Sequence, residues 1–351
     1  MSDFKKILAA YDQNVQKGIS TSSLNGGSGS ATITTRQDLD SVIVNLANRN
    51  TPLRDKITRT RGQGAAFTYN QKTNLYAAGD PSTNPRDMVY ADGGLPEMRT
   101  TQYATTIVPY VSIGMAGSVT GLAEASGESL LDLYAAEVES TTRTVIQGEE
   151  WLNFWGSTST MSRVTSVPQY AGLDQLITTN IVDATGSTIS KYLFDQAANL
   201  IAQQGGQADT VYASFRTSAN LNNLYNIYSQ VIINGADRQA LTYGNMVKNI
   251  STIAGVLDIV PDFFLNPGNM YPLANGSSST PSGATTSTVF IVAHPFLEMR
   301  DLKPLGMEEL GRVADYRKFY VNEYTAMKLT AEKWCAKIIN VADAIVDTVV
   351  P

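Results

Sequence analysis

The chain has 351 residues, of which 43% are hydrophobic and 17% charged, and its formal net charge is −6. A chain of this length can bury a sizeable core without disulfide bonds or structural metal ions. Its single cysteine, Cys335, excludes both an internal disulfide framework and a cysteine-cluster metal site. The single histidine, His294, excludes sites built on several histidines, and the negative charge balance argues against binding held by nucleic-acid phosphates. No run approaches the roughly 18 apolar residues that a membrane helix needs, and no secretory start is visible, so we expect a soluble protein of a reducing cytoplasm.

Residues 1–35 have the composition of an arm. Gly, Ser and Thr dominate residues 18–35, GISTSSLNGGSGSATITT, and such a segment cannot bury enough apolar surface to fold by itself. Apolar residues at helical spacing predict a short helix over residues 35–50. Pro52 then disfavours its continuation, and the chain is expected to become extended.

Residues 61–112 are expected to form two extended limbs joined by a long irregular tip. Aromatic residues alternate in the first limb, as at Phe67 and Tyr69, and the middle of the segment is rich in glycine and proline. The limbs are polar on both faces. Because a lone two-stranded ribbon is marginal in water, this ribbon needs another surface to lie on.

A long helix is expected over residues 122–155. Its apolar stripe follows the spacing of one helix face and consists of Leu131, Tyr134, Val138, Val145, Leu152 and Trp155. Residues 121–160 carry seven acidic side chains and one basic side chain. Like charges at helical spacing cost a few tenths of a kcal/mol per pair, so we expect the carboxylates on the other faces, near a positive surface. The aromatic end of the helix, Trp151, Phe154 and Trp155, is assigned to the core beneath it.

The remainder alternates between helical and extended patterns, which makes the whole chain α+β. We expect helices over 187–206 and 216–230, strands over 208–215, 255–267 and 287–294, a surface loop over 275–287, and two strands within 317–341. In the first of these last two strands, Phe319, Val321, Tyr324 and Met327 fall on roughly alternate positions, with one offset.

The sequence holds none of the common motifs for phosphate binding or nucleophilic catalysis. It has no GxxxxGK(S/T), no GxGxxG between a strand and a helix, and no GxSxG elbow. Adjacent acids such as Glu149 and Glu150 point in different directions on a helix and do not face each other as an acid–base pair must. We expect Cys335 to pack as a small apolar side chain and His294 to be structural. No catalytic, cofactor-binding or metal site is therefore expected.

The order of these parts resembles the major capsid protein of tailed bacteriophages, the Hong Kong 97 type. The segments that carry the resemblance are NRNTPLRDKITRTRGQGAAFTYNQKTNLY (48–76), EVESTTRTVIQGEEWLNFWGS (137–157), VPQYAGLDQLI (167–177) and LTAEKWCAKIINV (329–341). The resemblance implies an α+β Hong Kong 97-type fold with an N-terminal arm, an extended β-ribbon loop, a long spine helix in a peripheral domain, and an axial α/β domain.

The resemblance also implies a division of the chain. The expected parts are an arm (1–57), an extended loop (58–112), a peripheral domain (113–168 and 311–334) and an axial domain (169–310 and 335–351). Such a protein assembles in the host cytoplasm, with copies of itself, into the hexamers and pentamers of an icosahedral virion shell. The shell encloses double-stranded DNA without sequence-specific binding and without a membrane. The arm is too short for an internal scaffolding segment, so we expect a separate scaffolding protein, beside a portal and a candidate decoration protein.

The uneven charge suggests how neighbouring subunits meet. We expect the basic segment before the ribbon to lie across the acidic helix of a neighbouring subunit, where exposed pairs would guide register more than supply stability. The candidate interface residues are Arg49, Arg54, Lys56, Arg59 and Arg61 on one side and Glu137, Glu139, Glu149 and Glu150 on the other.

Three alternatives stay open at this point. An encapsulin-like nanocompartment shell shares the fold, but it would be expected to lack a long arm, and residues 18–32 therefore favour a virus. A carbohydrate-binding or surface-layer protein would predict a secretory signal. An enzyme with an unrecognised site is disfavoured by the single histidine and single cysteine.

Overall fold

The computed structural model describes residues 49–74, 90–95, 102–127, 132–159, 168–226, 248–267, 286–312 and 314–344. All of them belong to one compact unit of the chain, residues 47–351. The expected arm up to residue 48, the helix predicted to begin at residue 35, and most of the predicted loop over 275–287 lie outside the described residues.

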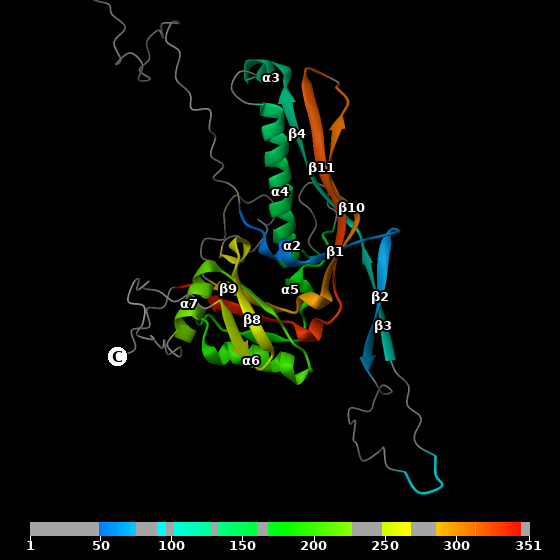
Figure 1. The fold of residues 1–351 in the computed structure, drawn as a ribbon, viewed down its shortest axis with the longest axis vertical. Helices are drawn as coiled ribbons and strands as arrows, with labels where there is room; N and C mark the ends of the chain where they lie inside the picture. The colour runs from blue at the N-terminus through cyan, green and yellow to red at the C-terminus, as the bar shows by residue number, and fades with distance from the viewer. Residues whose placement is uncertain are drawn as a thin grey trace, which may run out of the picture. The chain divides into compact units, whose positions relative to one another are not determined.

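A four-stranded sheet packs against the long helix α4 (Leu133–Trp155). Its strands are, in spatial order, β1 (Thr58–Arg61), β10 (Leu297–Leu310), β11 (Tyr316–Leu329) and β4 (Val111–Thr120). β1 runs parallel to β10, and the other neighbours are antiparallel. Figure 1 shows α4 running alongside β4 and β11. Gly117 allows close packing in β4, because a Cβ there would lie 2.5 Å from the Phe319 ring.

β11 alternates without an offset in its pairing with β4. Phe319, Val321, Glu323, Thr325 and Met327 are buried, as are Ala326 and Leu329 near the end of the strand. Tyr324, which the sequence pattern included with an offset, lies between the buried positions 323 and 325 and is itself only half-buried. Alternation of the strand thus places the charged side chain of Glu323 on the buried face.

The predicted helix over 122–155 is two helices. α3 spans Gly121–Gly127, and α4 begins at Leu133, where the Asp132 side chain accepts a hydrogen bond from Ala135 N at 3.0 Å. An N-cap of this kind satisfies one of the free N–H groups of the first turn. The predicted stripe is confirmed for its described members. Tyr134, Val138 and Val145 pack on the four-stranded sheet. Leu152 and Trp155 pack in a second buried cluster, here called the central core, which includes Leu53, Phe154 and Phe290.

A six-stranded sheet forms the second layer of the structure. Its strands are, in order, β5 (Ile181–Asp183), β12 (Ala336–Ala342), β9 (Thr286–Val292), β6 (Thr210–Ala213), β8 (Gly255–Pro261) and β7 (Asn249–Thr252). The helices of this part are α5 (Leu173–Leu176), α6 (Lys191–Gln203) and α7 (Phe215–Asn226). The strands and helices predicted between 187 and 294 are confirmed where the structure describes them.

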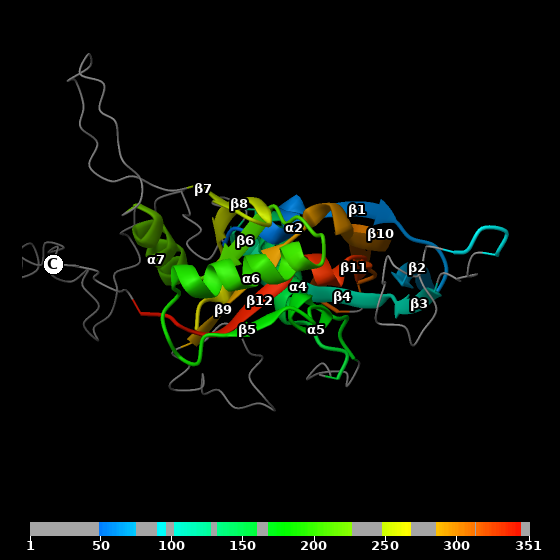
Figure 2. The same ribbon diagram turned by 90° about the horizontal axis from the view of Figure 1, so that it is seen from below.

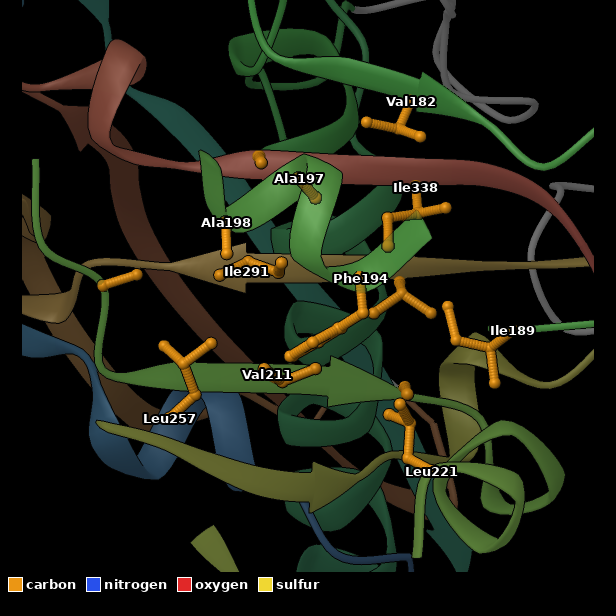
Figure 3. Packing of buried hydrophobic residues seen from close by; sticks show 14 of the residues in the cluster. Val182, Ile189, Phe194, Ala197, Ala198, Val211, Leu221, Leu257, Ile291 and Ile338 are labelled. Atoms are coloured by element: carbon orange, nitrogen blue, oxygen red, sulfur yellow. The ribbon is translucent and has the colours of Figure 1, made fainter. Parts of the chain in front are cut away.

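α6 covers one face of the six-stranded sheet (Figure 2). Ser190 caps its start by accepting from Leu193 N, and Gly205, with φ +73, lies just past its end. Phe194 and Ile201 of α6 meet Val211 and Ile291 of the sheet in a fully buried cluster (Figure 3). The alternate residues of the same strands face the other way and join the central core with the end of α4.

Residues 49–57 belong to the folded body, although the resemblance placed them in the arm. The short helix α2 (Pro52–Lys56) buries Leu53 completely in the central core, and Ile57 lies beside it. β1 follows directly. Residues 52–61 therefore form a segment, here called the strap, that is held on the body by burial of its apolar residues.

The predicted two-limbed ribbon is present as β2 (Ala66–Asn74) paired antiparallel with β3 (Gln102–Pro109). Figure 1 shows it as a two-stranded element apart from both larger sheets. One face contacts the chain's own body: Tyr69 Oη donates to Leu329 O at 3.4 Å, and Gln71 Nε2 donates to Thr330 O at 2.6 Å. The ribbon thus has the supporting surface expected for it. The expectation that its limbs are polar on both faces is wrong, because Phe67 is buried and Tyr103 and Ile107 are exposed on β3.

Strand β10 was missed by the sequence analysis. Pro304 and Gly306 interrupt its sequence, and its register with β11 shifts twice near them. Because β10 pairs with β1 and β11, the implied boundary between residues 310 and 311 separates two strands of one sheet. Residues 297–310 belong with the four-stranded sheet rather than with the six-stranded one.

Truncating Phe194 should destabilise the six-stranded sheet. Phe194→Ala removes a fully buried ring and leaves a cavity, with an expected cost of about 3–5 kcal/mol in the free energy of unfolding. The matched control, Tyr192→Ala, removes an aromatic side chain that is 73% exposed on the same helix and should cost about 0.5 kcal/mol or less. Urea denaturation of both variants checks this; equal losses would contradict the packing described here.

Candidate functional site

The last two turns of α4 carry two adjacent glutamates into the protein interior. Glu149 and Glu150 are both 0% exposed, although the sequence predicted the helix carboxylates on the exposed faces. The neighbouring aromatic residues Phe154 and Trp155 are buried in the central core, and Trp151 packs against it, so their predicted place is confirmed. A buried carboxylate must be compensated by a cation, by hydrogen bonds or by a proton.

Glu149 is compensated by two arginines of the strap. Arg54 Nε and Arg59 NH2 each form a salt bridge with one oxygen of its carboxylate. Charge-assisted bonds of this kind are the stronger class of protein hydrogen bond. Both arginines come from the basic segment that the sequence analysis had placed on a neighbouring subunit. The structure forms these contacts within one chain, because Leu53 anchors the strap beside the end of α4.

Arg59 continues the network to the four-stranded sheet. Its NH1 lies 3.1 Å from Asp301 Oδ2 on β10 and 3.6 Å from Glu323 Oε2 on β11. Glu323 is fully buried, and neither of its oxygens has a hydrogen-bond partner among the described residues. Burial raises the pKa of Glu323, and Arg59 opposes that rise. One guanidinium therefore serves three carboxylates from three elements.

Glu150 is compensated in a different way. Its two oxygens accept hydrogen bonds from Leu53 N at 2.8 Å and from Arg54 N at 2.7 Å, in the first turn of α2. Its carboxyl group also lies within hydrogen-bonding reach of the Asp262 side chain, which follows β8. Burial raises the pKa of Glu150, and the nearby Asp262 charge raises it further. Glu150 therefore ties the strap, α4 and the six-stranded sheet together.

The other candidate residues lie outside this cluster. Arg49 stacks on Phe263 at 4.5 Å, and Lys56 lies 3.6 Å from Asp258 and donates to Thr210. Glu139 pairs with Arg143 of its own helix at 2.6 Å. Arg61 and Glu137 are exposed. The structure thus brings together Arg54, Arg59, Glu149 and Glu150 and keeps the remaining candidates apart.

Sequence analysis missed three acids of the cluster: Asp262, Asp301 and Glu323. Glu323 stands at an inward position of an otherwise regular alternation in β11, and this was the available signal. Asp262 interrupts the apolar run that ends β8 and caps the turn η3 (Phe263–Leu265) by accepting from Phe264 N at 2.7 Å. Asp301 lies in the strand that was not predicted, so no signal pointed to it.

The arrangement is suited to holding elements together and not to turnover. Among the described residues, no group of three His, Cys, Asp or Glu side chains could hold a metal ion, and no helix of that part is long and apolar enough to span a bilayer. His294, in the turn η5 (His294–Phe296), lies 2.9 Å from Tyr212 Oη and 3.0 Å from Asp209 Oδ1. These contacts fit the structural role predicted for it.

Removing the charge of Glu149 should cost far more than removing that of an exposed acid on the same helix. Glu149→Gln leaves Arg54 and Arg59 without their shared buried counterion, and breaking such a pair costs about 3–5 kcal/mol. Glu139→Gln, the matched control, removes an exposed i,i+4 pair worth about 0.3–0.5 kcal/mol. Unfolding free energies at neutral pH check this, and similar values for the two variants would contradict the network.

The Cys335 thiol should be unreactive in the folded protein. It is fully buried before β12, next to the turn η6 (Glu332–Trp334), and burial raises its pKa to about 12. Because the thiolate is the reactive form, labelling by a thiol reagent at mildly alkaline pH should follow the unfolding rate. Rapid labelling in the absence of denaturant would contradict this assignment.

Comparison with known proteins places the chain in a family. The family described as SU10 major capsid protein matches residues 21–342, nearly the whole length. No curated protein matches at a significant level.

Solved structures share the fold at low sequence identity. The capsid of a native GTA particle has a TM-score of 0.62 at 10% identity, covering 93% of this chain and 100% of that one. The capsid of Myoviridae phage XM1 has a TM-score of 0.54 at 13% identity, covering 90% and 100%. The SrpI encapsulin of Synechococcus elongatus PCC 7942 has a TM-score of 0.57 at 10% identity, covering 89% and 95%. The mixed helix and sheet architecture is therefore that of phage capsid proteins, and the chain belongs to the SU10 major capsid protein family, a family of structural virion proteins rather than enzymes.

Proposed function

We propose that copies of this chain associate into hexamers and pentamers, which close into an icosahedral shell around double-stranded DNA. Membership of the capsid protein family supports the shell. The supporting observation in the structure is the ribbon, whose outer face exposes apolar side chains that no other described part of the chain covers.

The outer face of the ribbon is built by strand alternation. Tyr103 and Ile107 of β3 lie on one face, opposite Lys72 and Thr68 of β2. The two apolar side chains are 69% and 67% exposed. Fully burying a large apolar side chain stabilises by about 1.5–3 kcal/mol. A second copy that covers this face would gain that energy at every repeat of the contact in the shell.

Charged residues outside the buried cluster are the better candidates for contacts between copies. Arg61, Glu137 and Glu139 are exposed. The positive charge of Arg61 and the negative charges of Glu137 and Glu139 are therefore available for the contact between subunits expected from the sequence. Arg49 is also exposed and stacks on Phe263. Exposed pairs of this kind are worth roughly 0–1 kcal/mol each and set register more than affinity.

The parts of the chain take the following roles in this proposal. The segment up to residue 48 is the arm, the ribbon is the extended loop, α4 with the four-stranded sheet is the peripheral domain, and the six-stranded sheet with α6 and α7 is the axial domain. The neutral to acidic character of the chain, with a net charge of −6, suits a container that does not grip packaged DNA. A separate scaffolding protein, a portal and a decoration protein complete the proposed set of partners.

An encapsulin-like compartment is the second candidate, favoured by the similarity to the SrpI encapsulin fold. The two functions differ in their contents. Electron microscopy of the expressed chain, with and without the products of neighbouring genes, tests for closed particles. Nuclease-protected double-stranded DNA in particles from infected or induced cells supports the virion shell, whereas a packaged enzyme would support the compartment. A chain that stays monomeric under all these conditions would contradict both.

Polar substitution on the outer ribbon face should block assembly without affecting the fold. The double variant Tyr103→Ser with Ile107→Ser removes the exposed apolar side chains, and its unfolding free energy should stay within about 0.5 kcal/mol of the parent. Particle yield, measured by sedimentation, should fall strongly. Thr68→Ser, on the same face, is the matched control and should assemble normally. Normal yield from the double variant would contradict the proposed contact.

A further inference from the structure

Two acids without a cation partner meet at the junction of the two sheets. Glu150 of α4 is 0% exposed and Asp262, after β8, is 1% exposed. Within the described part of the chain, neither forms a salt bridge, because the Arg54 side chain turns to Glu149. The two carboxyl groups lie within hydrogen-bonding reach of each other. Two carboxylates are acceptors only, so a hydrogen bond between them requires a proton.

The remaining bonds of the pair reach three elements. Glu150 accepts from Leu53 N and Arg54 N of α2, at 2.8 and 2.7 Å. Asp262 Oδ1 accepts from Phe264 N at 2.7 Å, while Asp262 Oδ2 has no donor among the described protein groups. That oxygen is therefore a buried acceptor with room for one donor. The same turn is also held by Trp155, whose Nε1 donates to Phe264 O at 3.1 Å.

We propose that one proton shared by Glu150 and Asp262 is a latch that keeps α2, α4 and the end of β8 together, and that its loss loosens this junction. With the proton in place, the pair carries one negative charge. The backbone N–H groups of Leu53, Arg54 and Phe264 donate hydrogen bonds to it. Without the proton, two buried negative charges repel each other in a medium of low dielectric. Opening the junction to water then relieves the repulsion.

The direction of the pH dependence follows from the proton count. Burial raises the pKa of Glu150 from its ordinary 4.5 to about 9, and burial also raises that of Asp262. Between the ordinary pKa of 4.5 and the folded-state pKa of about 9, the folded chain holds a proton that the unfolded chain has lost. The contribution of the pair to stability is therefore complete below the unfolded pKa, declines as pH rises, and is lost above the folded pKa.

Other titratable and charged groups lie around the pair, and the two amide variants separate their effect from that of the pair. They are Arg54, Lys56 and Arg59 of the strap, Glu149 of α4, Tyr170 beside α4, Glu323 of β11, and Asp209 and Tyr212 with His294. Burial raises the pKa values of Tyr170 and Tyr212, so both phenols stay neutral in this range. Arginine side chains stay charged throughout.

Hydrogen exchange of the full-length chain tests the latch. The amides of Leu53 and Phe264 report its two sides, and their rates are corrected for intrinsic exchange from about pH 7 to about pH 10.5. In the parent, the opening constant should rise about tenfold per pH unit above the shared pKa. Glu150→Gln and Asp262→Asn each replace one acid with an amide that donates to the remaining carboxylate, so both profiles should be flat. Glu139→Gln should behave as the parent.

Each outcome decides the proposal. Flat profiles in both amide variants, with an alkaline rise in the parent and in the Glu139→Gln control, support the latch. A rise of equal size in Glu150→Gln or Asp262→Asn overturns it, as does a flat profile in the parent. Failure of Asp262→Asn to fold also overturns it, because this variant keeps the acceptor for Phe264 N and its amide donates to the Glu150 carboxylate. Glu150→Gln gives up the acceptor for one of the two backbone N–H groups of α2, so Asp262→Asn alone decides if Glu150→Gln does not fold. The measurement uses the unassembled chain and does not depend on the proposed shell.

Discussion

The end of α4 can be buried only because its two carboxylates find partners in segments that are distant in sequence. Glu149 lies between two arginines of the strap. Glu150 accepts hydrogen bonds from two backbone N–H groups of α2 and lies beside Asp262. Transfer of an unpaired carboxylate into the interior would cost more than most domains have in total stability. The strap, the four-stranded sheet and the six-stranded sheet must therefore all be in place before α4 can complete the core.

This requirement gives the short strap a role far beyond its length. Its apolar anchor, Leu53, fixes the position, and Arg54 and Arg59 then carry positive charge to acids on α4, β10 and β11. The segment that leads into the ribbon is thus held to both sheets.

Contacts within the chain and contacts between copies divide along the ribbon. The inner face of β2 is satisfied by the body through Tyr69 and Gln71, whereas the outer face carries Tyr103 and Ile107 in the open. The ribbon is therefore held in place by its own subunit and still has apolar surface to offer. Such a division lets a subunit fold by itself while assembly adds the remaining burial.

The sequence by itself determined the elements whose signals are local. Helical spacing gave the stripe of α4, and roughly alternate apolar or aromatic positions gave β2 and β11. It also placed the aromatic end of α4 in the core, and the order of parts indicated the capsid family. Only the tertiary structure decided which acids are buried and which arginines meet them, because a glutamate on a helix has the same local pattern whether solvent or a strap lies above it. The pairing of β10 with β1 and the contact of Glu150 with Asp262 belong to the same class: both join residues about a hundred or more positions apart, which no local pattern records.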